Sequence, residues 1–363
     1  MTVKDKSVNA WQIGILLFIL LFANKILVLP SLLYDGAKVE AFFIPVILFA
    51  LELGLLVLFY KVKTKFPTQS FAEIIKEHLG KVVTYIVFIL IMVFFICKAV
   101  LLYNITYIFF RNLIYKEADN ILFLFCFLPV INHLAISGLR VMGRTAQLFF
   151  PVIVVVTLFC IVVGFFGIGS MPLFFESSFS DVMLTAFKHI SSFGDVLFLF
   201  VFMDKIQIKK GQWKILFSLA GSAMIVVTII TVVFIFSYTY TSFMHPYALF
   251  EIMSYVKEYG GLGRIDIISM IVIIIYTYFH LAIYLKAFMA SFNVVFRKID
   301  EIYSVLTFNF LFLIFINFLV LNLEKAVFYG EDILPYFSVI SFIIIPLVCL
   351  VLLCFKHRKK RGD

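Results

Sequence analysis

The chain has 363 residues, of which 64% are hydrophobic and only 14% are charged, and its mean hydropathy is +1.12. A soluble domain does not carry so much apolar sequence, so the composition excludes that class and indicates a polytopic membrane protein. The formal net charge of +9 does not indicate nucleic-acid binding, because the basic residues fall in short connections between apolar segments.

Apolar segments long enough for an α-helix to cross a bilayer recur along the whole chain, at about 20 residues per span. They predict an all-α protein with about ten transmembrane helices in one integral membrane domain, residues 1–363. The approximate segments are 11–34, 41–60, 82–114, 120–136, 145–166, 181–203, 213–238, 262–290, 303–322 and 333–355. The cysteines all lie in apolar runs and resemble small hydrophobic residues rather than metal ligands.

Lysine and arginine gather in alternate connections, which sets the expected orientation. The basic connections and the basic tail are residues 61–65, 76–81, 140–144, 205–214, 297–298 and 356–361. The other connections hold few such residues. The positive-inside rule therefore predicts that both termini lie in the cytoplasm.

The first apolar segment contains a charge and a helix breaker. Lys25 lies about 14 residues into the segment, roughly 21 Å along a helix, which is far for snorkelling to an interface. Pro30 removes a backbone donor five residues later. We predict a broken helix that lines an enclosed cavity, with Ala23, Asn24, Lys25 and Ile26 as candidate ligand-binding residues. The alternative is a proline-kinked helix with a snorkelling lysine.

The sixth segment contains a second interruption, at Ser191-Ser192-Phe193-Gly194. Glycine frees the backbone, and serine side chains can replace lost helical hydrogen bonds, so these four residues are also candidate ligand-binding residues. Breaks in helices 1 and 6, five helices apart, predict a LeuT-like five-plus-five inverted repeat. A kink without a function is the alternative.

Further charged residues lie inside the predicted spans. Counted along the helices, Lys25, Lys98 and Lys188 are expected about 21–26 Å from the inner surface. Glu52 and Asp195 are expected at roughly 12–14 Å. If they face one cavity, its outer half is cationic and suits a ligand carboxylate. We predict that Lys98 binds the ligand. The predicted ion or proton pathway consists of Glu52, Lys188 and Asp195. The alternative is that these charged residues pair with one another and hold the bundle together.

Lys25 needs a compensating negative charge, because a charged lysine near the membrane centre costs about 2.5–3.5 kcal/mol on insertion scales. The sequence leaves two partners open, a ligand carboxylate and Asp195. We expect the ligand, because Lys98 and Lys188 make the same region cationic.

In the eighth segment Tyr276, His280 and Tyr284 recur every four residues and share one face of the helix. We predict Tyr276 and His280 as ligand-binding residues. His280 is also a candidate proton relay, and a buried histidine that donates to a carbonyl is an equal alternative.

Two connections predict helices of their own. Residues 67–80 contain a capping box, Ser70 with Glu73, and end at Gly80, which predicts an amphipathic helix on the inner surface. Residues 246–259 begin with Pro246 and predict an outer interfacial helix. The spans show no nucleophile–base pattern, phosphate-binding loop or metal cluster, so we expect neither an enzyme nor a cofactor.

Four local patterns resemble one known family. They are Ile26-Leu27-Val28-Leu29-Pro30, the stretch from Phe66-Pro67 to Gly80-Lys81, His245-Pro246 before the outer helix, and Arg264-Ile265-Asp266 before an apolar run to Tyr284. In this order, over about residues 8–355, the chain resembles the permease-like B subunit of spore germinant receptors, in the amino acid–polyamine–organocation superfamily. It departs from that family at Ala23-Asn24-Lys25, where small residues are usual.

The resemblance implies residence in the spore inner membrane and a complex with a receptor A subunit and a lipoprotein C subunit. It also implies that a small nutrient, such as an amino acid, binds in the mid-membrane pocket and triggers germination. Two other functions stay open, a proton-coupled amino acid transporter of the same fold and a purely structural membrane subunit.

The orientation gives a testable prediction. In a variant without native cysteines, single cysteines at 170–178 and 325–332 should react with a membrane-impermeant thiol reagent added outside. Cysteines at 206–212 and in the C-terminal tail should react only after the membrane is opened, because the positive-inside rule places them in the cytoplasm. Labelling of 206–212 from outside would contradict both the helix count and the inverted repeat.

Overall fold

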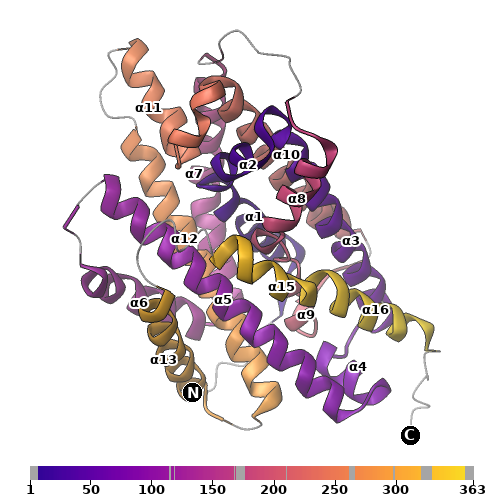
Figure 1. Cartoon of the computed structure of the whole chain (residues 1–363). Coiled ribbons are helices and arrows are strands. Elements are labelled where there is room, and N and C mark those ends of the chain that lie inside the picture. Colours follow the sequence, from indigo (N-terminus) through magenta and orange to yellow (C-terminus); the bar gives the residue numbers. More distant parts are fainter. Residues whose placement is uncertain are drawn as a thin grey trace, which may run out of the picture.

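The computed structural model describes residues 7–113, 116–117, 119–166, 168, 176–209, 211–260, 266–296, 299–319 and 329–355. Most of these residues lie in helices, and the two strands are two residues long each (Figure 1). Arg264, Ile265 and the basic residues 297–298 and 356–361, which the sequence analysis used, lie outside the described residues.

The first half of the chain begins with a short strand and a helix that is interrupted at residues 23–28. Its elements are β1 (Val8–Asn9), α1 (Ala10–Phe22), the 3₁₀ turn η1 (Asn24–Ile26), α2 (Leu29–Ala37), η2 (Lys38–Phe42), α3 (Phe43–Lys65), α4 (Phe71–His78), α5 (Lys81–Leu113), α6 (Asn120–Ile136) and α7 (Leu139–Phe166).

The second half begins with a helix that is interrupted in the same way. Its elements are α8 (Phe179–Lys188), η3 (Ile190–Ser192), α9 (Leu197–Val201), β2 (Ile206–Gln207), α10 (Trp213–Tyr238), η4 (Thr239–Met244), α11 (Ala248–Gly260), α12 (Asp266–Val295), α13 (Glu301–Leu319), the π-helical η5 (Tyr329–Ile333), α15 (Leu334–Val339), the π-helical η6 (Ile340–Ile344) and α16 (Ile345–Cys354).

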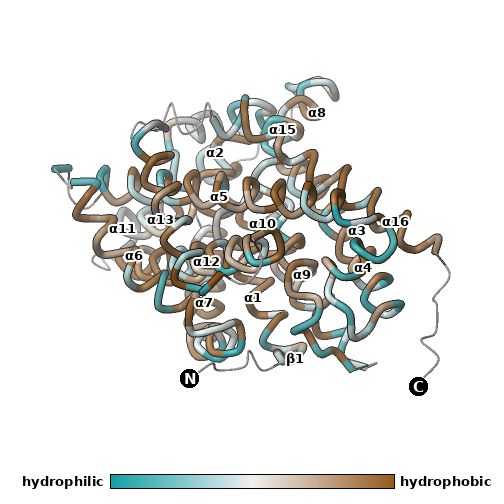
Figure 2. Tube along the Cα trace, turned by 90° about the horizontal axis from the view of Figure 1, so that it is seen from below, coloured by the Kyte–Doolittle hydropathy of each residue, from teal (hydrophilic) through white to brown (hydrophobic). Residues whose placement is uncertain are grey.

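Within the described part of the chain, six helical segments are long and apolar enough to cross a membrane. They are Leu29–Lys65, Lys81–Leu113, Leu139–Phe166, Trp213–Tyr238, Ile267–Val295 and Tyr329–Cys354, with shorter apolar helices at Ala10–Phe22, Asn120–Ile136 and Glu301–Asn317. In Figure 2 hydrophobic residues cover most of α16, whereas hydrophilic residues gather around α4 and β1. The chain is thus an all-α polytopic membrane protein, as its composition predicts.

Helix α1 lies at the centre of the bundle. Every residue of α1 except Trp11 is buried. A helix that is apolar on all sides is stable when other helices surround it, and α1 packs along α10 and α7. Helix α12 packs against α5 and passes behind it in Figure 1, and α15 also contacts α5.

The ends of several elements meet at the side expected to face the cytoplasm. Strands β1 and β2 pair in parallel, with Val8 opposite Ile206. The Lys65 ammonium donates to the carbonyls of Leu352, Leu353 and Phe355 at the end of α16. A lysine in this position satisfies carbonyls that a helix end leaves free.

Both predicted connecting helices are present, and each is shorter than predicted. Helix α4 begins at Phe71 rather than at residue 67, because Ser70 and Glu73 form the predicted capping box directly before it. Helix α11 begins at Ala248 rather than at Pro246. The Ala248 amide donates to the carbonyl of Leu27, 2.8 Å away, so the start of α11 satisfies a carbonyl that the break after α1 leaves free.

Two glycines give a matched test of helix packing. A Cβ atom on Gly164 of α7 would lie 2.2 Å from Val233 Cγ1 of α10, whereas a Cβ atom on Gly54 of α3 would meet nothing within 4 Å. Gly164→Ala should therefore lower the free energy of unfolding by about 1–3 kcal/mol through overpacking. Gly54→Ala should leave it unchanged or raise it by up to about 1 kcal/mol. Thermal unfolding of both variants in detergent checks this, and equal effects would contradict the close approach.

Candidate functional site

The first break carries Lys25 into the interior. Helix α1 ends at Phe22, η1 makes one tight turn, and α2 starts at Leu29 with Pro30 in its first turn, where a missing N–H costs nothing. The Lys25 side chain is completely buried. Its Nζ atom donates to Asp195 Oδ2 at 2.6 Å and lies 4.9 Å from the centre of the Phe193 ring.

The second break exposes backbone groups between η3 and α9. Phe193 is extended, and Gly194 has a φ of +91°, which glycine adopts far more easily than other residues. A Cβ atom on Gly194 would also lie 2.6 Å from Ser341 Oγ. This position therefore requires glycine for two reasons, the positive φ angle of its backbone and the close approach of Ser341.

Glu52 of α3 satisfies the free amides of this break. Its carboxylate accepts hydrogen bonds from the amides of Gly194 at 2.6 Å, Asp195 at 3.1 Å and Val196 at 3.3 Å. Glu52 is completely buried. A carboxylate that accepts several backbone N–H groups is strongly stabilised, so Glu52 ties α3 to the second break.

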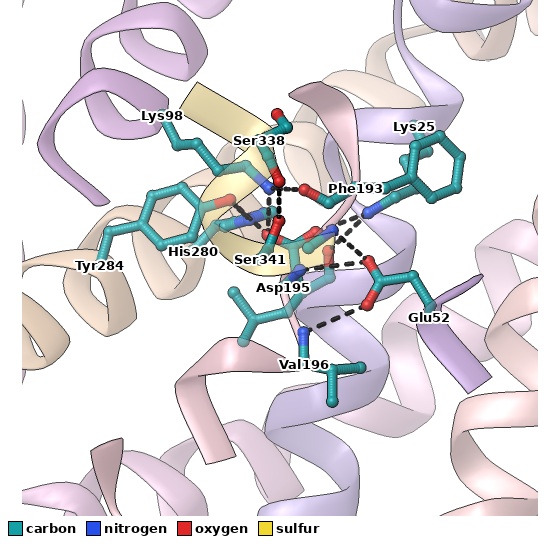
Figure 3. Close-up of polar contacts among 12 residues, drawn as sticks. Lys25, Glu52, Lys98, Phe193, Asp195, Val196, His280, Tyr284, Ser338 and Ser341 are labelled. Carbon is teal, nitrogen blue, oxygen red and sulfur yellow. Dashed lines mark hydrogen bonds and ion pairs between the residues drawn. The ribbon is translucent and has the colours of Figure 1, made fainter. Parts of the chain in front are cut away.

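Asp195 is the centre of the network drawn in Figure 3. Besides Lys25, Lys98 of α5 reaches it, with Nζ 2.5 Å from Oδ1. The Tyr284 hydroxyl of α12 donates to the same Oδ1 at 2.8 Å, and His280 Nε2 lies 2.6 Å from that hydroxyl. Lys98 also donates to the Phe193 carbonyl at 3.0 Å.

The network balances its charges in a place that excludes water. Lys25, Glu52 and Asp195 have no exposed surface, and Lys98 is 4% exposed. Two ammonium groups face two carboxylates. Such a cluster is stable only while every member keeps its partners, because removing one partner of a buried pair costs about 3–5 kcal/mol.

The sequence matches a known family over most of its length. The model of the family described as "Spore germination protein" matches residues 7–326. The chain belongs to this family. No curated protein matches it. The family is one of permease-like membrane proteins, which agrees with the helical bundle and with the resemblance that the local patterns indicate.

Several predicted site residues of this germination protein come together in the structure. Those in or directly beside the network are Ala23, Ile26, Lys25, Glu52, Lys98, Phe193, Gly194, Asp195 and His280. Asn24 lies in the first break, and its side chain is outside the described part of the structure. That these residues bind a ligand or conduct ions stays a prediction.

The other predicted residues form no hydrogen bond or ion pair with the network in the described part of the structure. Lys188 is half-buried in the last turn of α8 and, among the described residues, forms no ion pair with the buried carboxylates. Ser191 donates to the Gly330 carbonyl of η5 at 2.8 Å, and Ser192 is half-buried in the same turn. Tyr276 and Phe22 form an edge-to-face pair, with 6.2 Å between the ring centres.

The structure bears on two expectations about the charges. Of the two partners left open for Lys25, the structure shows Asp195, and a contact of Lys25 with a ligand carboxylate stays a prediction. We expected lysines and carboxylates at different depths, whereas Lys25 and Lys98 both contact Asp195. The expected depths came from counting residues along straight helices. The count failed because the helical segments that carry Lys25 and Asp195 are both interrupted and because lysine side chains are long.

The sequence analysis missed two contributors. Tyr284 was placed on the face of His280 but not in the site, although its spacing already suggested a contact with the histidine. Ser341 closes the space over Gly194, and its hydroxyl donates to the Ser338 carbonyl at 2.8 Å. No sequence signal distinguishes Ser341 from other serines in apolar helices.

Charge balance predicts how variants of the network behave. Lys25→Met leaves one excess negative charge and Asp195→Asn one excess positive charge, so each should destabilise the protein by about 3–5 kcal/mol. The double variant is neutral again and should be more stable than either single variant. Thermal unfolding and membrane abundance measure this, with the exposed Lys61→Met as control. Additive losses in the double variant would show that the charges do not interact.

Proposed function

We propose that this protein is the permease-like subunit of a spore germinant receptor and binds a small nutrient, most simply an amino acid, where its two helix breaks meet. The observation that carries the proposal is the contact of Lys25 in the first break with Asp195 in the second, at 2.6 Å. Broken helices build binding sites in membrane transporters, because their ends offer free backbone groups at mid-membrane depth. Membership of the germination family supports the same conclusion.

The network provides a way for a ligand to change the conformation. An amino acid carries a carboxylate and an ammonium group, which match Lys98 or Lys25 on one side and Asp195 on the other. A ligand that takes over these contacts releases the direct link between the two breaks. The free energy of binding is then coupled to movement of α1 against α9, and this movement is the germination signal in our proposal.

The proposal extends to the architecture and the partners. Helices 1 and 6 of a ten-helix, five-plus-five inverted repeat correspond to α1–α2 and α8–α9, and both are interrupted. The fold would then be that of the amino acid–polyamine–organocation superfamily. The subunit lies in the spore inner membrane with both termini in the cytoplasm, and acts with a receptor A subunit and a lipoprotein C subunit.

A proton-coupled amino acid transporter is the second candidate. One observation favours it, the buried chain from His280 through the Tyr284 hydroxyl to Asp195, with steps of 2.6 and 2.8 Å. Ionisable residues linked in this way inside a membrane mark proton relays in pumps and transporters. A transporter would move its substrate across the membrane, whereas a receptor subunit needs only to bind it.

Spores without the gene test the proposal. They should lose the response to one class of compound in a panel of amino acids, sugars and nucleosides, and the wild-type gene should restore it. Gly194→Ala should reach the membrane but not restore the response, because the added Cβ atom meets Ser341 and strains the backbone. The matched Gly54→Ala, which meets nothing, should restore it fully.

An unchanged response in the deletion strain to every compound of the panel would refute the receptor function. Uptake by purified protein in liposomes separates the two candidates. Accumulation of a labelled amino acid that depends on an imposed proton gradient would favour the transporter, and saturable binding without accumulation would favour the receptor.

A further inference from the structure

A large hollow lies at the end of the bundle where β1 and β2 pair. Its volume is about 1150 Å³, and parts of α3, α7 and the start of α10 complete its wall. The paired residues Val8 and Ile206 line it and are completely buried. The hollow is therefore walled by packed elements of the bundle and is not a gap between exposed loops.

Basic residues dominate the charge of this lining. Lys63 comes from α3, Arg140 and Arg144 come from α7, and Lys209 follows β2. Among the described residues that line the hollow, only Asp204 is acidic. Four basic residues and one acidic residue around one concave space favour the binding of anions there.

The two arginines of α7 lack protein partners. They are four residues apart, so they lie on the same face of the helix, and both line the hollow. In the described part of the chain neither forms an ion pair or a side-chain hydrogen bond. Like charges at this spacing repel each other. A bound anion with several oxygen atoms would remove this repulsion.

Lys63 gives an independent indication of an anion. It is only 6% exposed, and its Nζ atom donates to the carbonyls of Pro67 at 2.7 Å and Met203 at 2.6 Å. A lysine ammonium has three N–H donors, so one remains. The described structure places no carboxylate within ion-pair distance of this nearly buried cation. Buried charges are normally paired, and an anion in the hollow would supply the missing partner.

The positive-inside rule does not account for this arrangement. It explains why basic residues gather at this side of the membrane, and the exposed Lys61 and Lys214 are examples that do not line the hollow. The rule requires neither a concave site nor a buried lysine.

We propose that this hollow binds a small anion that carries two or more phosphate groups. Guanidinium groups bind phosphate oxygens in pairs, and a lysine ammonium binds them as a point charge. Cations spread over α3, α7 and the segment after β2 need more than one anionic group. Pockets for small ligands have volumes of about 300–1,000 Å³, so the hollow suits a small molecule better than a protein segment. A free phosphate compound and a lipid headgroup share this chemistry.

The hollow shares no residue with the network of Asp195, so the inference goes beyond the proposed function and does not depend on it. Both interrupted helices nevertheless lead to it. Strand β1 directly precedes α1, and β2 follows α9. An anion that bridges α7 and the segment after β2 therefore holds the ends of the two interrupted helices together.

Inorganic tripolyphosphate is the probe. Its binding to the full chain in phosphatidylcholine nanodiscs is measured by isothermal titration calorimetry, with empty nanodiscs subtracted. It should bind saturably and about tenfold or more tightly than orthophosphate, because it reaches several cations at once. A second arm compares nanodiscs that contain diphosphatidylglycerol with nanodiscs of equal charge that contain phosphatidylglycerol. Loss of tripolyphosphate binding with the diphosphate lipid alone assigns the site to a lipid headgroup, and equal binding in both assigns it to a soluble compound.

Variants separate the hollow from general surface charge. The double variant Arg140→Gln/Arg144→Gln should weaken tripolyphosphate binding by about tenfold or more. Its matched control, Lys61→Gln/Lys214→Gln, removes the same formal charge outside the hollow and should keep the wild-type affinity. Asp204→Asn removes the acidic residue of the lining and should strengthen binding.

Unfolding temperatures and size-exclusion profiles establish that each variant is folded before affinities are compared. Equal losses in the two double variants would show that only surface charge attracts the probe, and would overturn the proposal. Weaker binding in Asp204→Asn would do the same. Absence of saturable tripolyphosphate binding to the wild-type protein in phosphatidylcholine nanodiscs would also overturn it, and binding of a polyglutamate peptide in its place would assign the hollow to an acidic protein segment.

Discussion

The middle of this protein depends on a single carboxylate. Asp195 accepts contacts from Lys25 in the first break, Lys98 of α5 and Tyr284 of α12. An ionised carboxylate away from water is stable only with close and complete partners. The positions of these helical segments relative to the second break are therefore fixed together, and a shift of one segment changes the electrostatic free energy of all the others.

The breaks are possible because other parts of the chain satisfy their backbone groups. Hydrocarbon offers no hydrogen bonds, so an interrupted helix must find its partners within the protein. Glu52 accepts three amides of the second break, and Lys98 donates to the carbonyl of Phe193. At the first break the amide of Ala248 donates a hydrogen bond to the carbonyl of Leu27. Each interruption is thus held by an element distant in the sequence.

Local chemistry explains which features the sequence could predict. A lysine five residues before a proline in an apolar run indicates an interrupted helix wherever the surrounding helices lie, as does a glycine shortly after paired serines. Ser70 with Glu73 specifies a helix start by itself. The sequence named Asp195 as one of two possible partners of Lys25 but could not decide between them, because the contact depends on how two interrupted helices cross. Ser341 illustrates the same limit, since only its contact with Gly194 gives it a role.

Charge balance also restricts the ligand that the proposed receptor can use. The network holds two lysines and two carboxylates with almost no exposed surface, and their formal charges sum to zero. A ligand with one charge would leave an uncompensated ion at mid-membrane depth, where its cost is about 2.5–3.5 kcal/mol or more. A zwitterion brings both charges and can replace an internal pair without changing the total. The same argument explains why a lysine is tolerated at position 25, because Asp195 supplies in the resting protein the negative charge that a ligand carboxylate would supply after binding.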